Sequence, residues 1–487
     1  MQLLDLITIF IFALGIVIMG LSFSGKGRNM KSFFAAGGAV PWAMSGLSLF
    51  MGFFSAGTFV VWGSIAYSLG WIAISIQWTM AIAGFVVGFF IAPRWHKTSA
   101  LTVAEYITRR LGVNTQKTYT YLFLFISLFT TGSFLYPVAK IVEVSTGMPL
   151  DLCILLLGGF CIVYVAAGGL WAVVSTDVLQ FIILTAAVLI VVPLSFGRVG
   201  GVVNFIESIP ATYFNLVNGE YTIGFIIAFG VYNAIFLGGN WAYVQRYASV
   251  NSQSSARKVG FLFGGLYVVS AVLWMLPPMI YRIVNPSLST IDAEGAYLMM
   301  CKEVLPAGLL GLMLSGMVFA TASSLNATLN ISSGVVTNDI FKRLFPQSSD
   351  KTLMRVARIS TIIFGLLAII VALLIPLMGG IVNVVISVAA LTGVPLYLPI
   401  IWTLFSKRQT EYSVITTTLV SLGANAFFKF ITPLWGFGFN RAEEMIVGVA
   451  FPVFCLIAFE LYYKLNHKIS HRYVEYQEWE KENNCIT

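Results

Sequence analysis

Apolar runs long enough to cross a lipid bilayer recur along almost all of this 487-residue chain. A helix needs about 20 such residues to cross a hydrocarbon core of about 30 Å. Lipid offers no hydrogen-bond partners, so each run must satisfy its own backbone as a helix. Only 10% of the residues are charged, whereas soluble domains carry about a quarter. The chain is therefore expected to be an all-α integral membrane protein.

Hydropathy predicts about thirteen transmembrane helices. The first carries Asp5 near its start, has no Lys or Arg before it and is followed by no A-x-A-like cleavage site, so it is expected to be a retained span rather than a signal peptide. The ninth is too long for one simple crossing, so we expect it to bend or to extend past the membrane. The spans are residues 3–22, 42–65, 71–93, 118–140, 151–170, 175–196, 222–244, 259–284, 304–335, 356–377, 381–404, 412–434 and 444–463.

Basic residues gather in alternate loops between these spans. About 22 of the 28 lie on one side, which the positive-inside rule makes cytoplasmic. The N-terminus is then outside and the C-terminus inside a cell (inner) membrane. This bias explains the net charge of +8 without nucleic acid as a partner. The loop residues on the cytoplasmic side include Lys26, Arg28, Lys31, Arg94, Lys97, Arg109, Arg110, Lys117, Arg246, Arg257, Lys258, Lys342, Arg343, Lys351, Arg355, Arg358, Lys407 and Arg408.

Several function classes lack their signatures. No GxxxxGK[ST] motif supports ATP-driven transport, and the five cysteines contain no CxxC pair. Enzyme chemistry within the membrane is disfavoured, since the spans hold no His, paired carboxylates or activated nucleophile. The charge that stands out within the spans is Asp177, at the start of the sixth. It is either a functional carboxylate or a solvated residue at the helix end, and the sequence favours neither.

Three stretches interrupt the smooth apolar pattern. Residues 48–58 combine two glycines with hydroxyl side chains in mid-membrane, which predicts local unwinding. Unwound carbonyls are ligands for sodium, and discontinuous helices build transporter sites in this way. In residues 315–333, Ala320, Ser323 and Ser324 share one helix face, either as a cation site or as a packing seam. In residues 231–240, polar residues and the Gly238–Gly239 pair are expected to ease bending near an inner gate.

Five motifs occur in order and on the expected side of the membrane. Together they resemble the sodium:solute symporter family, which includes sodium-coupled sugar, sialic acid and proline carriers, over roughly residues 30–410. The motifs are AAGGAVPW (35–42), LTVAEYITRRLG (101–112), GGLWAVVSTDVLQ (168–180), VQRYASVNSQSSARKVG (244–260), and ATASSLNATLN (320–330) followed by Asp339.

The resemblance implies a LeuT-like fold, with ten core helices in two inverted five-helix repeats. The repeats would span residues 42–196 and 222–404 within one transmembrane domain. One extra helix (3–22) would precede the core, two (412–463) would follow it, and residues 464–487 would form a cytoplasmic tail.

The resemblance also implies a sodium site between the first and eighth core helices. Backbone carbonyls of the first would act with a carbonyl and two hydroxyls of the eighth. These positions fall on Met51, Phe54, Ala320, Ser323 and Ser324. Some members bind a second sodium ion through the aspartate matched by Asp177. The hydroxyls that complete that site are Asn326 and Ala327 here, which puts a second ion in doubt.

A solute site beside the sodium ion is implied in the same way. Gln77 and Asn233 match positions that hydrogen-bond sugar hydroxyls, and Phe236 matches a stacking aromatic gate. Charged residues of related carriers are replaced here by Gly57, Thr130 and Tyr267, so no fixed charge is expected to pair with the solute. The matched positions are Ser55, Thr58, Gln77, Thr130, Asn233, Phe236 and Tyr267, with Asn383 and Ser387 as looser candidates.

The expected function is therefore sodium-coupled symport of a small solute by alternating access. An amide clamp with an aromatic platform suits a neutral, sugar-like solute. The alternatives are a sodium-coupled carrier of a small carboxylate or other metabolite, and a non-transporting sensor or channel on the same scaffold. The expected partners are sodium, the solute and the lipid bilayer, with no obligate protein partner.

Overall fold

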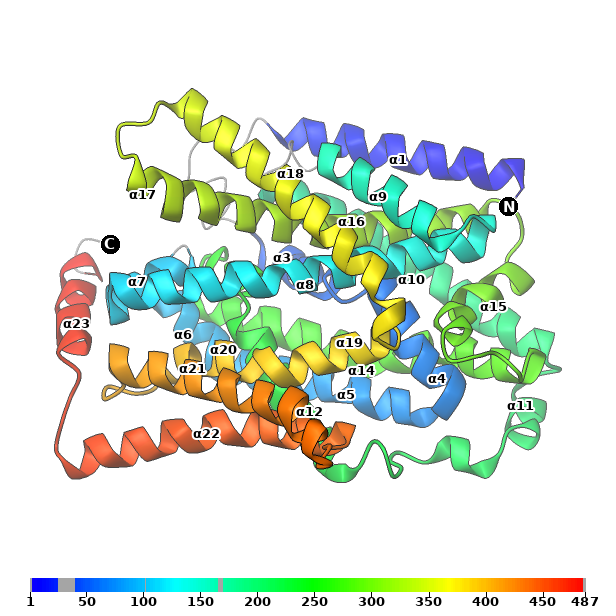
Figure 1. The fold of residues 1–487 in the computed structure, drawn as a ribbon. Coiled ribbons are helices and arrows are strands. Elements are labelled where there is room, and N and C mark those ends of the chain that lie inside the picture. The colour runs from blue at the N-terminus through cyan, green and yellow to red at the C-terminus, as the bar shows by residue number, and fades with distance from the viewer. Residues whose placement is uncertain (1, 25–39, 101, 165–169, 485–487) are drawn as a thin grey trace.

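The computed structural model describes residues 2–24, 40–100, 102–164 and 170–484. Residues 35–39, 101 and 168–169 of three motifs lie outside the described residues, as do the side chains of Ser323, Asn326, Ala327 and Asp339. Every regular element of the described chain is helical (Figure 1). The first half holds α1 (Leu3–Ser24), α3 (Trp42–Met51), η2 (Thr58–Trp62), α4 (Gly63–Leu69), α5 (Trp71–Val86), η3 (Val87–Ile91), α6 (Ala92–Lys97), α7 (Val103–Leu111), α8 (Val113–Thr146), α9 (Leu150–Tyr164) and α10 (Leu170–Arg198).

The second half continues the bundle. It holds α11 (Val202–Ser208), η5 (Ala211–Phe214), α12 (Ile223–Gly239), α13 (Trp241–Ala248), α14 (Gln253–Val284), η6 (Asp292–Gly295), α15 (Ala296–Val304), α16 (Leu309–Val335), η7 (Val336–Phe341) and α17 (Lys342–Leu344). It ends with α18 (Asp350–Leu374), η8 (Pro376–Met378), α19 (Ile381–Val388), η9 (Ala389–Gly393), α20 (Val394–Thr403), α21 (Glu411–Ala426), η10 (Phe427–Ile431), η11 (Thr432–Trp435), α22 (Arg441–Leu465) and α23 (His471–Asn484).

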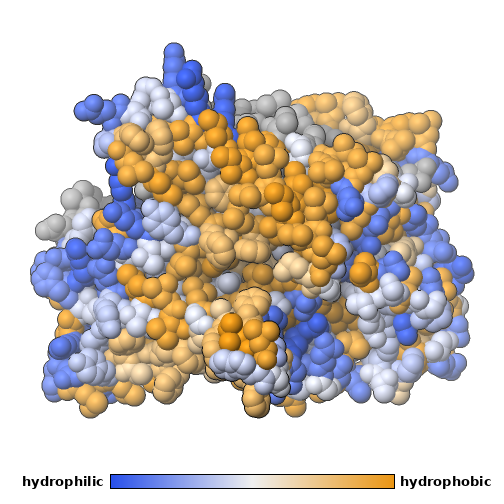
Figure 2. All heavy atoms as spheres, in the orientation of Figure 1, coloured by the Kyte–Doolittle hydropathy of each residue, from blue (hydrophilic) through white to orange (hydrophobic). Residues whose placement is uncertain are grey.

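The membrane-spanning character of the bundle is visible in its helices. Among the described residues, eight helices are long and apolar enough to cross a bilayer, or nine if the bent pair α12–α13 is one span. Shorter apolar helices, including α3 and part of α16, lie among them. Figure 2 shows hydrophobic residues across the middle of one face and hydrophilic residues towards its two ends. In Figure 1 the N- and C-termini lie at opposite ends of the bundle.

The expected ninth span, residues 304–335, corresponds to α16, which begins five residues later and continues into η7. Residues 296–304 form the separate short helix α15, and the long helix α16 begins at Leu309. The basic residue Arg246 also differs from its predicted place in a solvated loop. It lies in α13 with a relative exposure of only 9%, packed inside the bundle. The loop assignment was wrong because a hydropathy scan places every charged residue in solvent. It carries no information about a buried hydrogen-bond partner such as Ser48.

A close crossing of glycines holds α5 and its continuation η3 against α14. Gly84 and Gly88 face Gly264 and Gly260, so each helix presents two glycines four residues apart. A Cβ on Gly84 would lie 2.8 Å from the Gly264 Cα, which leaves no room for any side chain. Small residues at this spacing let helix backbones approach closely in membranes. The crossing fixes α5 and α14 side by side, and these helices carry Gln77 and Tyr267.

The expected bend near Gly238 and Gly239 is present. Helices α12 and α13 meet at 59°, and Asn240 separates them and caps α13 through its side chain. Both glycines are helical, and both lie against neighbouring helices. A Cβ on Gly239 would approach the Tyr397 Cβ to 2.7 Å, whereas one on Gly238 would meet the outer end of Ile91 at 2.8 Å. Close packing therefore explains Gly239 as directly as ease of bending does.

We expect Gly239→Ala to cost more stability than Gly238→Ala. The added methyl group at residue 239 must displace the fixed Cβ of Tyr397, while the end of Ile91 can turn aside. Overpacking of this kind costs about 1–3 kcal/mol. Thermal unfolding of the two purified variants in detergent measures the difference. A larger loss in Gly238→Ala would show that packing against Tyr397 is not the constraint.

Candidate functional site

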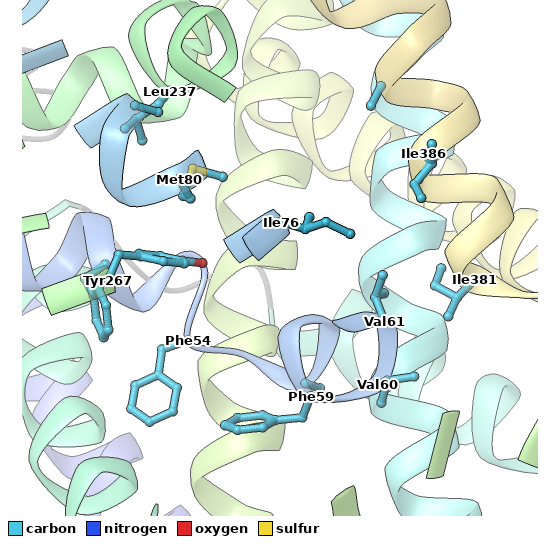
Figure 3. Close-up of a cluster of buried hydrophobic side chains, with 14 of the residues drawn as sticks. Phe54, Phe59, Val60, Val61, Ile76, Met80, Leu237, Tyr267, Ile381 and Ile386 are labelled. Carbon is cyan, nitrogen blue, oxygen red and sulfur yellow. The ribbon is translucent and has the colours of Figure 1, made fainter. Parts of the chain in front are cut away.

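A break in the first core helix forms the centre of the candidate site. Helix α3 ends at Met51, and helical coiling resumes at Ala56, followed by a π-helical turn from Thr58. The Thr58 N–H donates to the Ser55 carbonyl at 3.0 Å, not to the Phe54 carbonyl that a continuous helix would use. Figure 3 shows the chain leaving helical geometry beside Phe54 and coiling again at Phe59. The predicted unwinding therefore occurs, and it places the Phe54 carbonyl outside α-helical pairing.

Helix α16 meets this break directly. The Ala56 N–H, which would bond Gly52 in a continuous helix, donates to Thr321 Oγ1 at 2.9 Å. Ala320 is buried, and the Ser324 hydroxyl lies 3.5 Å from its carbonyl oxygen. Met51 and Ser324 both line a cavity of about 90 Å³, which we call the smaller cavity. The structure thus places Met51 and Ser324 on one cavity and Ala320 beside Ser324. Phe54 belongs to the broken segment but lines neither cavity, and the side chain of Ser323 lies outside the described residues.

A buried polar network borders the smaller cavity. The Ser48 hydroxyl donates to Asp177 Oδ2 at 2.6 Å, and Arg246 Nε donates to the Ser48 oxygen at 3.0 Å. Asp177 is only 4% exposed, so its placement as a solvated helix-end residue is excluded. Thr328 lines the same cavity. The network links α3, α10 and α13 on one side of the helix break.

A larger cavity of about 180 Å³ lies beside the helix break. Seven of the nine expected solute residues line it: Ser55, Thr58, Gln77, Thr130, Asn233, Phe236 and Tyr267. The other two lie elsewhere, because Asn383 donates to the Met378 carbonyl at 2.8 Å and Ser387 accepts a hydrogen bond from Lys429 at 3.0 Å. None of the described residues that line the larger cavity is charged.

Two amides in the larger cavity differ in their hydrogen bonding. Gln77 is 3% exposed, and its Nε2 has no hydrogen-bond partner among the described residues. Asn233 Nδ2 donates to Thr79 Oγ1 at 2.8 Å, and Thr79 in turn donates to the Ile76 carbonyl. A buried donor without a partner is costly and needs an explanation. A ligand atom in the cavity would supply the missing acceptor for Gln77.

An aromatic cluster separates the two cavities. Phe236, Tyr243 and Tyr397 line both, and the Phe236 ring lies 5.6 Å from Tyr243 and 5.8 Å from Tyr397. Phe53 completes the cluster at 5.0 Å from Tyr243. The sequence interpretation found Phe236 but missed Phe53, Tyr243 and Tyr397. A signal was available for Tyr243, which follows the helix-breaking Asn240 by three residues.

The family of this chain follows from its similarity to known proteins. A model of the sodium:solute symporter family matches residues 33–420. The chain belongs to the sodium:solute symporter family. It is a multi-pass membrane protein that transports a solute together with sodium, and the prediction of a transporter rather than an enzyme is confirmed.

Two characterised cotransporters are similar to this symporter in sequence, and one solved symporter is similar in structure. A sodium/glucose cotransporter of Vibrio parahaemolyticus is 28% identical over 472 residues, covering 88% of this chain and 86% of the relative. A sodium/myo-inositol cotransporter 2 of Sus scrofa is 27% identical over 469 residues, covering 86% and 68%. A solved structure of a Na+-coupled sialic acid symporter, substrate-bound and outward-open, has a TM-score of 0.78 at 21% identity, covering 94% and 98%. The expected LeuT-like fold is thus confirmed.

Proposed function

We propose that this symporter imports a neutral, polyhydroxylated, sugar-like solute together with sodium. The observation that carries the proposal is the buried Gln77 amide, whose Nε2 has no partner among the described residues and which belongs to the lining of an uncharged, aromatic-lined cavity. A hydroxyl of the solute would accept from Gln77, and the Asn233 oxygen would face another because Thr79 holds the amide nitrogen. Sites built to hydrogen-bond a hydroxyl discriminate strongly against analogues that lack it. The names of the two sequence relatives support the same solute class.

The sodium ion would bind at the junction of α3 and α16. Its ligands would be the carbonyls of Met51, Phe54 and Ala320 with the hydroxyls of Ser323 and Ser324. Such an all-oxygen set suits a hard monovalent cation. Asp177 is already hydrogen-bonded to Ser48 in a network with Arg246, so we propose that it serves the network rather than a second sodium ion.

Transport would follow alternating access across two inverted repeats, residues 42–196 and 222–404. Sodium would join the two halves of the broken helix to α16 and favour the solute-competent state. Reciprocal coupling of this kind amounts to about 1–3 kcal/mol, and membrane voltage adds about 2.3 kcal/mol per charge per 100 mV. We place the N-terminus outside and the C-terminus in the cytoplasm of a cell inner membrane, and expect no nucleic acid or obligate protein partner.

A transport panel tests the solute class. Purified symporter in proteoliposomes is supplied with labelled neutral sugars, polyols and small carboxylic acids, with and without an inward sodium gradient. We expect accumulation of a sugar or polyol only under the gradient. Gradient-driven uptake confined to the carboxylic acids would reject the proposed solute, and binding without uptake would favour the sensor alternative.

A further inference from the structure

The helix that would supply three of the five proposed sodium ligands begins without a side-chain cap of its own. Helix α16 starts after Gly308, which has a φ of +89°, and no side chain of its own N-cap residue bonds its first N–H groups. The first turn of any helix leaves backbone donors without intrahelical partners. In a buried helix these donors need acceptors from another part of the chain.

Helix α1, which lies outside the expected ten-helix core, supplies that acceptor. Asp5 Oδ1 accepts from the N–H of Gly308 at 2.7 Å and of Gly311 at 3.1 Å. Asp5 is 1% exposed, and its Oδ2 accepts from the Gln2 N–H at 2.8 Å. The Thr8 hydroxyl also lies 3.1 Å from the Gly308 carbonyl. A carboxylate at a helix N-terminus is further favoured by the helix dipole.

The contact between α1 and α16 is close and continues towards the sodium junction. A Cβ on Gly311 would overlap the Asp5 carbonyl oxygen and the Thr8 hydroxyl, so the backbones touch here. Further along, the rings of Phe12 and Phe319 pack with centroids 5.8 Å apart. Phe319 immediately precedes Ala320. Gly311 and Ala320 are nine residues apart in the sequence, which corresponds to roughly 14 Å along a helix.

We propose that α1 sets the depth of α16 in the bundle through Asp5, which is thereby a positioning residue for sodium binding. A buried carboxylate cannot leave its N–H donors without becoming an unpaired buried charge. The start of α16 is therefore held to α1, and the rigid helix transmits that position to Ala320 and Ser324. Binding atoms must be held within about 0.5 Å to be effective. The inference rests on the sodium ligands proposed above.

Substitution of Asp5 by asparagine tests this role. Asn keeps the shape and an acceptor oxygen but removes the charge. We expect Asp5→Asn to raise the sodium concentration for half-maximal uptake by about three- to tenfold, with the solute KM at saturating sodium and the maximal rate within about twofold of wild type. The matched control is Asp292→Asn, because Asp292 is exposed and accepts from Ser289 in its own loop. It should leave the sodium requirement unchanged.

A second variant guards against misfolding. If size-exclusion chromatography shows that Asp5→Asn does not fold, Thr8→Val removes the hydroxyl bond to Gly308 without changing charge, and we expect a smaller shift in the same direction. An unchanged sodium requirement in the folded variant overturns the inference. A lower maximal rate with an unchanged sodium requirement also overturns it, since a purely structural role predicts that pattern.

Measurement of Ser324→Ala in parallel separates this inference from the sodium site itself. If Ser324→Ala raises the sodium requirement and Asp5→Asn does not, only the positioning role fails. If Asp5→Asn raises it and Ser324→Ala does not, the control by α1 stands and the ligand assignment fails.

Discussion

Replacement of Ser323 and Ser324 by alanine together is expected to abolish sodium-driven accumulation of the solute. The Ser324 hydroxyl lies beside the Ala320 carbonyl at the junction with the broken helix. A hydrogen-bond or ligand oxygen directed at a charge contributes about 1.5–3 kcal/mol, so each lost hydroxyl weakens sodium binding roughly 10- to 150-fold. Uptake into proteoliposomes should then be equally slow with and without the gradient.

A control on the same helix makes this prediction specific. Ser315 is buried in α16, and its hydroxyl donates to the Gly311 carbonyl at 2.7 Å. It lines neither cavity. Ser315→Ala should therefore keep gradient-driven uptake. Accumulation that survives in the double variant, or is lost equally in Ser315→Ala, would remove the serines from the sodium site.

Gln77→Leu is expected to weaken solute binding without lowering the stability of the protein. Leucine has a similar size and removes the buried Nε2 that has no partner among the described residues. Loss of an unsatisfied buried donor does not destabilise a protein and can stabilise it, so the unfolding temperature should stay level or rise. The solute KM at saturating sodium should rise by about tenfold or more, because the solute loses its hydrogen-bond donor.

The control for this variant is a glutamine that is already satisfied. Gln116 is 2% exposed, donates to Thr120 at 2.9 Å and accepts from Arg343 at 3.3 Å, away from both cavities. Gln116→Leu should show the reverse pattern, with lower stability and an unchanged solute KM. A lower unfolding temperature and a normal KM in Gln77→Leu would mean that Gln77 is a packing residue.

Much of the fold could be predicted because the bilayer restricts the choices. Helices follow from the apolar runs, and the break near Gly52 follows from glycines and hydroxyls in mid-membrane. The proposed sodium ligands follow from the family resemblance, because the face that Ala320 and Ser324 share is by itself equally compatible with a packing seam. Thr321, which accepts from the broken segment, lies beside that face and was missed. Periodicity identifies which residues share a helix face, but it does not identify which side chain will accept a hydrogen bond from a neighbouring segment.

The remaining features depend on partners far apart in the sequence. The sequence alone places Arg246 in a loop, because its hydrogen-bond acceptor Ser48 lies about 200 residues earlier in the chain. The sequence alone shows Asp5 as a charge near the N-terminus, because its donors, the N–H groups of Gly308 and Gly311, lie about 300 residues later. Asn383 was expected near the solute, whereas its side chain donates to the carbonyl of Met378 in the preceding helix η8. In each case the deciding contact is tertiary, and hydropathy carries no information about it.

Coupling between the cavities has a structural basis in shared residues. Gly52, at the helix break, lines both the smaller cavity, beside the proposed sodium ligands, and the larger cavity, where we propose that the solute binds. Phe236, Tyr243 and Tyr397 separate the two cavities and also line both. A cation bound at the break, as we propose, would therefore also fix one wall of the larger cavity, and this would supply the reciprocal coupling that symport requires.

Equilibrium binding of radioactive sodium to the purified protein in detergent, without solute or gradient, tests most directly whether the ion is held between the broken helix and α16. We predict saturable binding in the wild type, in Ser315→Ala and in Asp177→Asn, and loss of most of that binding in Ser324→Ala. Undiminished binding in Ser324→Ala together with its loss in Asp177→Asn would place the ion in the network of Ser48 and Arg246 and contradict the proposed site.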